Sequence, residues 1–584
     1  MRKRWKILPF DPDQVKQLES EAKIPTVVAQ LLLNRGIDNG DQISKFLENK
    51  LSGLRPPEEL PGIPEASALI YQAVKAGKKI LIYGDYDADG MTASSILYRC
   101  LSLLHANVAY FAPNRMSDGY GLNADQIRRH HERGFELIIS VDCGIANADE
   151  IDVAKELGMQ VVVTDHHEFA ERLPDADVIV HPRLPGTTYP FGGLCGAAVA
   201  LKLAWALCQL DSEATRVKPA HRDFLMMAVG IAAIGTVADV VPLQDENRIL
   251  VTHGLRCLKD QPPLGLSALM KLTGLTSKRQ FDAQDIGFNI GPRLNAAGRL
   301  GQAPLGVELL VTEDPQRAQE LADYLDNLNN DRKKIERSIN LAAVKQIKEK
   351  YDEENDPAFV LAGHGWNAGV IGVVSGRLAE KYGRPVILIA LDQLGVKPGI
   401  GSARNGGIGN LHETLQHCTE HLIKHGGHAA AAGLTMEESK VDAFRSAFCE
   451  YIEESITDED RIVEIVIDAE AVLSQLTTQT IVQMQQLGPF GEANPAPVLC
   501  ASNVDIVPGS ARRMGGGERH LSVKVSQYGK TLRAVAFGQG DWAEELDQVQ
   551  GQIDVVFKPV INEFRGQRNV ELHLEDWRPV GESA

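Results

Sequence analysis

KILIYGDYDADG, residues 79–90, joins a short apolar run to a loop that contains three aspartates. The apolar part, Ile80–Tyr83, has the length and the branched side chains typical of a buried strand. It stops abruptly at Gly84, and Gly84 and Gly90 together permit a tight turn. We therefore expect a strand that ends in a charged loop.

The same pattern recurs through the first third of the chain. Four more apolar runs end in polar or turn residues, namely 108–111 before APNR, 137–141 before DCG, 161–163 before TDHH and 178–180 before HPR. Helical stretches separate most of them, for example 92–104 and 148–157. Alternating strands and helices predict a parallel sheet with helices on both faces, and ligands bind such sheets at the carboxyl ends of the strands.

Acidic and imidazole side chains gather at these predicted strand ends. They are Asp85, Asp87, Asp89, Asp142, Asp165, His166 and His167; a further carboxylate, Asp239 in GTVADVVP, directly follows the apolar segment 224–238. Clustered carboxylates repel one another without a cation, so a metal is their natural partner. A mixed oxygen and nitrogen donor set without thiolate suits Mn²⁺ or Mg²⁺, and its size suggests two ions. Taken alone, GDYDADG could also be a calcium loop or a solvated turn, and Asp239 by itself is more typical of a solvated loop.

The remaining chain divides into segments of different character. We expect a helical arm over 1–55, an α/β domain over 56–311, a connecting helix over 312–354, a glycine-rich α/β domain over 355–456 and a β-barrel over 460–580. The pattern of 312–354 fits one spacer helix or two consecutive core helices, and it leaves both open.

Composition excludes several classes of protein. The 584 residues are 44% hydrophobic and 24% charged, which excludes a wholly disordered chain. With 60 basic and 78 acidic residues, the net charge of −18 argues against a broadly basic DNA-coating protein. It does not exclude an enzyme that threads one nucleic-acid strand through a locally basic cleft. The 8 cysteines include no CxxC pair. The longest weakly polar run, 224–238, is too short for a membrane span, so we expect a buried helix, no membrane contact and a cytoplasmic location.

The ordered motifs GDYDADG, PNR, VDCG, TDHH and GTVADVVP resemble those of the DHH phosphoesterase superfamily, and GGHAAAAG resembles its associated C-terminal domain. GPRLNAAGR (291–299), WNAGVIGVVSGRLAEKYGRPV (366–386) and GSAR (401–404) are similar more narrowly to bacterial exonucleases of that superfamily. The resemblance covers about residues 25–578. It implies a parallel-sheet DHH domain, a long helix, a smaller α/β DHH-associated domain and a C-terminal β-barrel of the oligonucleotide-binding (OB) type.

The resemblance also assigns roles to individual residues. It implies that the metal ligands, which carry catalysis, are Asp87, Asp89, Asp142, His166, His167 and Asp239. It implies contacts with phosphate or DNA for Arg115, Asn295, Arg299, Ser402, Arg404, Gly426, Gly427 and His428. We expect Asp85 to hold its loop by accepting backbone hydrogen bonds. We further expect Asn295 and Arg299 to lie in a loop, and His428 to open a helix over the alanines that follow it.

The implied function is a Mn²⁺- or Mg²⁺-dependent exonuclease that degrades single-stranded DNA from its 5′ end into mononucleotides. It would act in recombination and repair beside a single-strand-binding protein and a RecQ-type helicase. In the barrel, Tyr528, Phe537 and Phe564 would stack on bases of the DNA strand. The cationic residues that would bind its phosphates are Arg512, Arg513, Arg519, Lys524, Lys530 and Arg533. Two alternatives are a DHH phosphoesterase for small phosphorylated substrates and a non-catalytic single-strand-binding scaffold.

Overall fold

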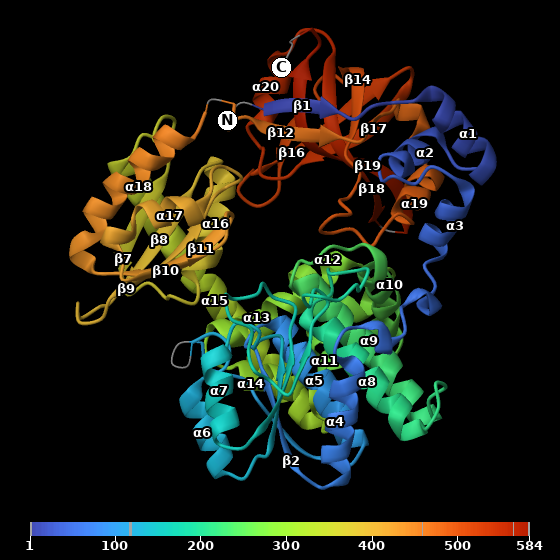
Figure 1. The fold of residues 1–584 in the computed structure, drawn as a ribbon. Coiled ribbons are helices and arrows are strands. Elements are labelled where there is room, and N and C mark those ends of the chain that lie inside the picture. The colour runs from blue at the N-terminus through green and yellow to red at the C-terminus, as the bar shows by residue number, and fades with distance from the viewer. Residues whose placement is uncertain (1–2, 116–118, 458, 565, 582–584) are drawn as a thin grey trace. The chain divides into compact units, whose positions relative to one another are not determined.

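The computed structural model describes residues 3–115, 119–457, 459–564 and 566–581, and the side chain of Phe564 lies outside the described part (Figure 1). The chain divides into two compact units. The larger unit is Leu51–Arg461 with Gly491–Ala493, and the smaller comprises Met1–Lys50, Ile462–Phe490 and Asn494–Ala584.

A five-stranded parallel sheet organises the first part of the larger unit. Its strand order is β3-β2-β4-β5-β6. The strands are β2 (Lys79–Gly84), β3 (Asn107–Phe111), β4 (Leu137–Val141), β5 (Gln160–Thr164) and β6 (Val178–Val180). Each of the five apolar runs is therefore a strand, and every neighbouring pair is parallel.

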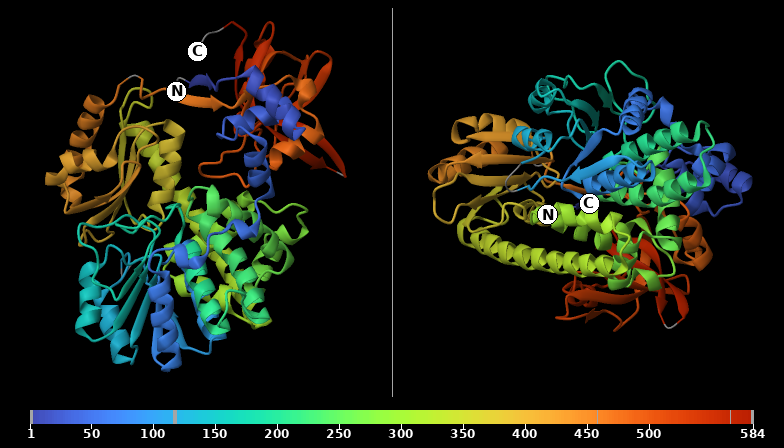
Figure 2. Two further views of the ribbon diagram at one scale, coloured as in Figure 1. Left: turned by 45° about the vertical axis from the view of Figure 1, so that its right-hand side comes forward. Right: turned by 90° about the horizontal axis from the view of Figure 1, so that it is seen from below.

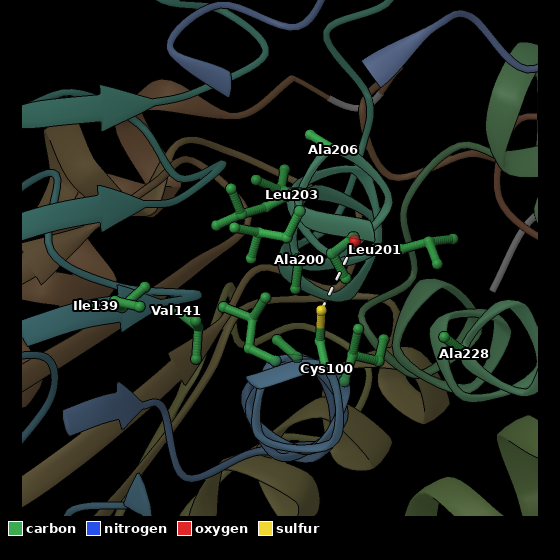
Figure 3. Close-up of a cluster of buried hydrophobic side chains, with 14 of the residues drawn as sticks. Cys100, Ile139, Val141, Ala200, Leu201, Leu203, Ala206 and Ala228 are labelled. Carbon is green, nitrogen blue, oxygen red and sulfur yellow. Dashed lines mark hydrogen bonds between the residues drawn. The ribbon is translucent and has the colours of Figure 1, made fainter. Parts of the chain in front are cut away.

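Helices cover both faces of this sheet because its side chains alternate between two apolar cores. Ile80 and Ile82 face one core, whereas Leu81 and Tyr83 face the other. The first core is closed by α4 (Ile63–Lys75), α5 (Ala88–Leu103), α8 (Gly196–Ser212) and α9 (Pro219–Ala238), and the second by α6 (Ala124–Glu132) and α7 (Ala148–Glu156). In the first core, Cys100 of α5 points toward α8, and Ile139 and Val141 of β4 belong to the same cluster (Figure 3).

Helix α9 is long and apolar enough to cross a membrane by length and composition alone. In the structure it packs against α5, α8 and α10 (Asp245–Asp260), and most of its apolar residues are buried. It is therefore a core helix, as predicted for 224–238.

A helical layer follows the sheet and leads into one long helix. The layer contains α10, α11 (Leu264–Leu272), α12 (Ala283–Asp285), the π-helical turn Ile286–Ile290, α13 (Gly291–Arg299) and α14 (Ala303–Val311). Next comes α15 (Pro315–Lys350), a single helix of 36 residues (Figure 2), so the two-helix alternative is wrong. Leu321 and Leu325 of α15 belong to the core of the helical layer, and Ile339 and Ile347 belong to the core of the second domain.

The second domain is built on a mixed sheet of order β10-β11-β9-β8-β7. Its elements are β7 (Phe359–His364), α16 (Ile371–Tyr382), β8 (Val386–Leu391), β9 (Gly399–Arg404), α17 (Leu411–His417), β10 (Lys424–Gly427), β11 (Ala431–Met436) and α18 (Val441–Ser455). Helices α15 and α16 pack on one face, and α17 and α18 on the other.

The helix expected after His428 is wrong. Residues 424–436 form a β-hairpin, because β11 pairs with β10 on one side and β9 on the other. Alanine has the highest helix propensity, but such propensities are worth less than about 1 kcal/mol per residue, and two ladders of backbone hydrogen bonds outweigh them.

The smaller unit is a closed barrel packed against the N-terminal arm. Strands β14, β18, β19, β17 and β16 form a ring that closes where β16 pairs with β14. The barrel elements are β12 (Val463–Ile467), β13 (Ala469–Glu470), α19 (Thr478–Gln485), β14 (Leu499–Ile506), β15 (Arg512–Met514), β16 (His520–Gln527), β17 (Lys530–Ala536), α20 (Trp542–Gln548), β18 (Ile553–Phe564) and β19 (Gln567–Pro579). The arm consists of β1 (Lys3–Ile7), α1 (Pro12–Ala22), α2 (Thr26–Leu33) and α3 (Gly40–Glu48). The arm and the barrel share one core, and β1 pairs with β12, so the helical arm is not an independent element.

A buried polar cluster lies between the two apolar segments of α15. The Arg332 guanidinium donates to Asn329 Oδ1 at 2.9 and 3.2 Å and also to the Glu336 carboxylate. Arg377 of α16 contacts the second oxygen of Glu336 at 2.9 Å. Glu336 thus ties the middle of α15 to the second domain.

Replacing this carboxylate should destabilise the larger unit. Glu336→Ala leaves Arg332 buried without its charged partner, which should cost about 3 kcal/mol. Lys334→Ala is the control, because Lys334 lies on the same helix with 78% of its side chain exposed. Calorimetric melting should show a clear drop for Glu336→Ala and almost none for Lys334→Ala; equal melting curves would contradict a stabilising role for the cluster.

Candidate metal centre

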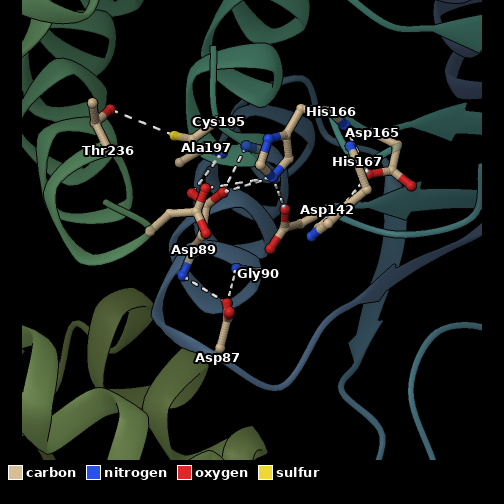
Figure 4. Close-up of polar contacts among 12 residues, drawn as sticks. Asp87, Asp89, Gly90, Asp142, Asp165, His166, His167, Cys195, Ala197 and Thr236 are labelled. Atoms are coloured by element: carbon tan, nitrogen blue, oxygen red, sulfur yellow. Dashed lines mark hydrogen bonds and ion pairs between the residues drawn. The ribbon is translucent and has the colours of Figure 1, made fainter. Parts of the chain in front are cut away.

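The aspartate loop is fixed by hydrogen bonds to two helix N-termini. Asp87 caps α5 and accepts from the N–H groups of Asp89 and Gly90 at 2.9 and 3.0 Å (Figure 4). Asp89, in the first turn of α5, accepts from the N–H groups of Gly196 and Ala197 at 2.6 and 2.9 Å. These two amides begin α8, where the helix dipole favours a negative charge. Both carboxylates are therefore held in place by backbone groups.

His166 lies among three carboxylates that come from different elements. Its Nε2 atom is 3.0 Å from Asp142 Oδ1, 3.6 Å from Asp239 Oδ2 and 3.8 Å from Asp89 Oδ2. Asp142 directly follows β4 and has a left-handed backbone with φ of 62°. Asp239 follows the C-terminal end of α9. Four segments thus bring one donor each to the same point (Figure 4).

Asp165 holds the adjacent histidines rather than joining the donor groups. Its Oδ1 accepts from the N–H groups of His166 and His167 at 2.7 and 3.1 Å, and it lies 2.8 Å from His167 Nδ1. Its Oδ2 accepts from the N–H of Ile145 at 2.9 Å. Burial alone would raise the pKa of Asp165, but these hydrogen bonds lower it to about 2.

Three overlapping groups of donor atoms could hold metal ions. Within each group all chosen atoms lie within 4.8 Å of one another; the groups are Asp142–His166–His167, Asp89–His166–Asp239 and Asp85–Asp87–Asp142. All six predicted ligands are therefore brought together. Asp85 joins them as well, whereas the sequence favoured a loop-holding role for it.

The electrostatics of the site fit a cation. Burial and neighbouring carboxylates raise the pKa values of Asp85, Asp87 and Asp142, and burial together with Asp89 raises that of Asp239 to about 8. Among the described residues, the buried atoms Asp85 Oδ1, Asp142 Oδ1 and His166 Nε2 make no hydrogen bond of acceptable geometry, although the last two lie 3.0 Å apart. Divalent ions would neutralise this repulsion and engage these atoms, and carboxylate with imidazole is a donor set for Mn²⁺ or Mg²⁺.

The three predicted phosphate-binding arginines of the larger unit, Arg115, Arg299 and Arg404, lie within electrostatic reach of one another. Burial, then Arg115, lowers the pKa values of Arg299 and Arg404, that of Arg299 to about 10. Their contacts are with neutral groups. The Arg115 guanidinium lies 5.1 Å from the centre of the Tyr86 ring, and Arg299 donates to the Gly369 carbonyl at 3.1 Å. Arg404 donates to the hydroxyl of Ser402 at 3.2 Å and to the carbonyl of Ala403 at 2.7 Å. Guanidinium groups whose charges act on one another in this way form a site suited to phosphate.

Asn295 and Arg299 lie on helix α13, so the predicted loop is wrong. Asn295 Oδ1 accepts from the N–H of Ala88 at 2.8 Å and so supports the aspartate loop directly. At Gly298 the helix approaches this loop so closely that a Cβ atom would lie 2.0 Å from the Tyr86 carbonyl oxygen. Asn295 is thus placed to hold the loop, whatever contact it makes with DNA.

Gly426, Gly427 and His428 lie at the exposed end of the β10–β11 hairpin. The hairpin lies within electrostatic reach of Glu168, which follows the histidine pair: His428 helps to lower the pKa of Glu168, after the larger effect of the Arg183 hydrogen bond. Both glycines are paired with β11, so their amides belong to a strand and not to the expected helix N-terminus.

The sequence did not identify three groups of supporting residues. They are the N-terminal amides of α8, the accepting role of Asp165, and His181 and Arg183 after β6. The glycines of FGGLCGAA, directly before an apolar helical stretch, are a signal for the first group, since a backbone that approaches a carboxylate this closely needs small residues.

Comparisons with known proteins agree with this architecture. The chain matches the DHH family N-terminal domain over residues 79–231, the DHHA1 domain over 355–454 and the RecJ OB domain over 467–576. It is 39% identical to the single-stranded-DNA-specific exonuclease RecJ of Bacillus subtilis, over 98% of this chain and 70% of the relative. It is 33% identical to the protein of that name from Escherichia coli, over 99% of this chain and 100% of the relative.

Solved structures give the same result. RecJ from Thermus thermophilus in complex with Mn²⁺ matches with a TM-score of 0.84 and 31% identity, over 100% of this chain and 80% of that one. An exonuclease RecJ bound to manganese matches with a TM-score of 0.59 and 36% identity, over 70% of this chain and 98% of that one. The fold and the site together define a metal-dependent DHH-type phosphoesterase. Within that class, the chain belongs to the RecJ family of exonucleases.

The close approach of α13 to the aspartate loop can be tested with a single methyl group. Gly298→Ala must displace Tyr86 or the helix, which should cost about 1–3 kcal/mol and disturb the metal centre. The matched control is Gly287→Ala, whose Cβ would meet its nearest neighbour at an ordinary 3.8 Å. Melting curves with and without Mn²⁺ should show lower stability and a smaller Mn²⁺-induced shift for Gly298→Ala alone. If both variants match the wild type, the contact does not constrain the loop.

Proposed function

We propose that this chain hydrolyses single-stranded DNA from its 5′ end, with two divalent ions, and releases 5′-mononucleotides in recombination and repair. The observation that carries the proposal is the gathering of five carboxylates and two imidazoles at the carboxyl edge of the parallel sheet. We propose Asp87, Asp89, Asp142, His166, His167 and Asp239 as metal ligands, and we add Asp85 because it lies in one of the three donor groups.

Bound Mn²⁺ or Mg²⁺ would activate water and neutralise charge on the scissile phosphate, as in other two-ion hydrolases. The protein groups supply the geometry. Asp87 and Asp89 are fixed by amides from two helix N-termini, and Asp165 fixes the two histidines, so little reorganisation accompanies binding.

The arginine cluster supports recognition of the 5′ end. We propose that Arg115, Arg299 and Arg404, with the Ser402 hydroxyl and the amides of Gly426 and Gly427, bind phosphates beside the metal centre. Guanidinium forks and backbone amides are the groups that bind phosphate most readily. The exposed His428 is a further candidate for this contact.

We propose that the barrel binds the DNA strand beyond the site of cleavage. Tyr528 and Phe537 are 85% and 59% exposed, as stacking side chains must be. Arg513 pairs with Asp541 and Glu544, and Arg533 pairs with Glu571, so these two arginines are largely neutralised. We propose that Arg512, Arg519, Lys524 and Lys530 contact phosphates. On the resemblance alone, we propose a single-strand-binding protein and a RecQ-type helicase as partners.

The two alternative functions explain less of the chain. A phosphoesterase for small substrates would not need the RecJ OB domain that the chain matches at 467–576. A non-catalytic scaffold gives no purpose to the complete donor set. The direct test is product analysis on long 5′-labelled single strands with Mn²⁺, beside blunt duplex, RNA and pyrophosphate. Digestion from the 3′ end, or equal digestion of blunt duplex, would contradict the proposal.

His166→Ala should abolish cleavage without unfolding the protein. Its Nε2 is a buried atom without a hydrogen-bond partner among the described residues, so its removal costs the metal site more than the fold. We expect kcat to fall by about 10³-fold or more at saturating Mn²⁺, with unchanged affinity for single strands. The control is His412→Ala, at an exposed position on α17. Substantial cleavage by purified His166→Ala would refute the ligand assignment.

Arg404→Ala should weaken the preference for a 5′-phosphate over a 5′-hydroxyl by about tenfold or more, because a hydrogen bond to a charged group contributes roughly 1.5–3 kcal/mol. Arg404→Lys should recover part of the preference, since an ammonium cannot form a fork. Lys397→Ala removes an exposed charge from the same domain and serves as the control. Ratios of kcat/KM for the two ends measure the effect. If the preference survives in Arg404→Ala, the phosphate assignment is wrong but the metal assignment stands.

A further inference from the structure

His181-Pro182-Arg183 follows β6, and the proposed mechanism gives it no role. Strand β6 pairs in parallel with β5, and His166 and His167 lie just beyond the end of β5. The two segments therefore leave the same edge of the sheet side by side. Contacts between them are the basis of the inference.

His181 is fully buried and bound on both ring nitrogens. Its Nδ1 accepts from the N–H of Arg183 at 3.0 Å, so the ring proton resides on Nε2. Nε2 lies 2.9 Å from the His167 carbonyl oxygen and donates to it. The ring packs against Phe169, with ring centres 4.5 Å apart. One face of the imidazole is thus committed to packing and both nitrogens to the backbone.

Arg183 holds the other histidine of the pair. Its Nη2 donates to the His166 carbonyl at 2.6 Å, and its Nη1 donates to the Glu168 carboxylate. Its stem is confined, because a Cβ on Gly192 would lie 2.7 Å from Arg183 Cγ. The guanidinium therefore bridges the His166 carbonyl and the Glu168 carboxylate, both of which belong to the histidine loop.

All four backbone polar groups of His166 and His167 are therefore occupied. Asp165 accepts hydrogen bonds from both N–H groups. Arg183 donates to the carbonyl of His166, and His181 donates to the carbonyl of His167. Adjacent side chains point in opposite directions in extended chain, yet both imidazoles here join one donor group with Asp142. Fixing the planes of both peptides is a direct way to impose this arrangement.

We propose that His181 and Arg183 are positioning residues of the metal centre. They act by clamping the carbonyls of the two histidines, so that both imidazoles face the ions. The inference rests on the proposed function, because it takes His166 and His167 as metal ligands. It assigns to HPR a role that none of the catalytic or phosphate-binding residues fulfils.

The test compares Mn²⁺ binding in the absence of DNA, by isothermal titration calorimetry, with kcat and KM on single strands. His181→Phe keeps the ring and its packing but removes both hydrogen bonds. Arg183→Met keeps the stem and removes the fork, and Arg183→Lys keeps one charged donor. Phe169→Leu changes the side chain that packs on His181 but removes none of the hydrogen bonds, and Arg172→Leu removes a neighbouring surface charge that pairs with Asp149 and Asp152.

We expect Mn²⁺ affinity to fall about tenfold or more in His181→Phe and Arg183→Met, as for other residues that orient metal ligands. Arg183→Lys should be intermediate, and the two control variants should match the wild type. The value of kcat at subsaturating Mn²⁺ should fall with the affinity while KM stays constant. Melting curves identify any variant that fails to fold; if His181→Phe fails, the order wild type, Arg183→Lys, Arg183→Met decides.

Two results are distinguishable failures. Folded Arg183→Met with wild-type Mn²⁺ affinity and kcat would overturn the clamp and leave the proposed function intact. A wild-type chain that binds no Mn²⁺ in the same titration would overturn the proposed function, and the clamp with it.

Discussion

Repulsion among buried carboxylates is the constraint on which this structure depends. Asp85, Asp87, Asp89 and Asp142 are largely removed from water, and burial with mutual repulsion raises the pKa values of three of them. A chain can keep such groups charged only by surrounding them with positive partial charges or a cation. Helix N-termini provide the first, since α5 and α8 direct amides at Asp87 and Asp89. Divalent ions provide the second.

The parallel sheet makes this concentration possible. Its strands end at one edge, and the loops that leave this edge are short enough to be held by one another. Asp165 and the HPR segment fix the histidine loop from two sides, and Asn295 fixes the aspartate loop from α13. The aspartate loop is therefore held by a helix, and the histidine loop by its own Asp165 and by the segment after β6.

Helix α15 connects the helical layer of the first domain to the second domain. Its two ends belong to different apolar cores, and the polar cluster around Glu336 joins its middle to α16. Arg404 on β9 is thereby brought within electrostatic reach of Arg115 from the first domain. In the smaller unit, the N-terminal arm shares its core with the barrel, so residues at the two ends of the chain stabilise each other.

The sequence by itself determined the elements whose signals are local. Each apolar run that ends in a charged turn is a strand, and the residues after those strands include five of the six expected donors, while Asp239 follows helix α9. Such predictions succeed because strand ends in a parallel sheet must converge, whatever the details of packing.

Only the tertiary structure decided the remainder, because it depends on partners far away in sequence. Residues 428–436 have a composition suited to a helix, but β9 and β10 provide strand partners that no local pattern reveals. Asn295 looks like a surface residue until α13 brings it to Ala88, 207 positions earlier. Asp165 and Asp142 are equivalent in sequence, since each follows a buried strand. Their roles diverge because Asp165 meets the N–H groups of its own loop, whereas Asp142 Oδ1 meets only the other donors.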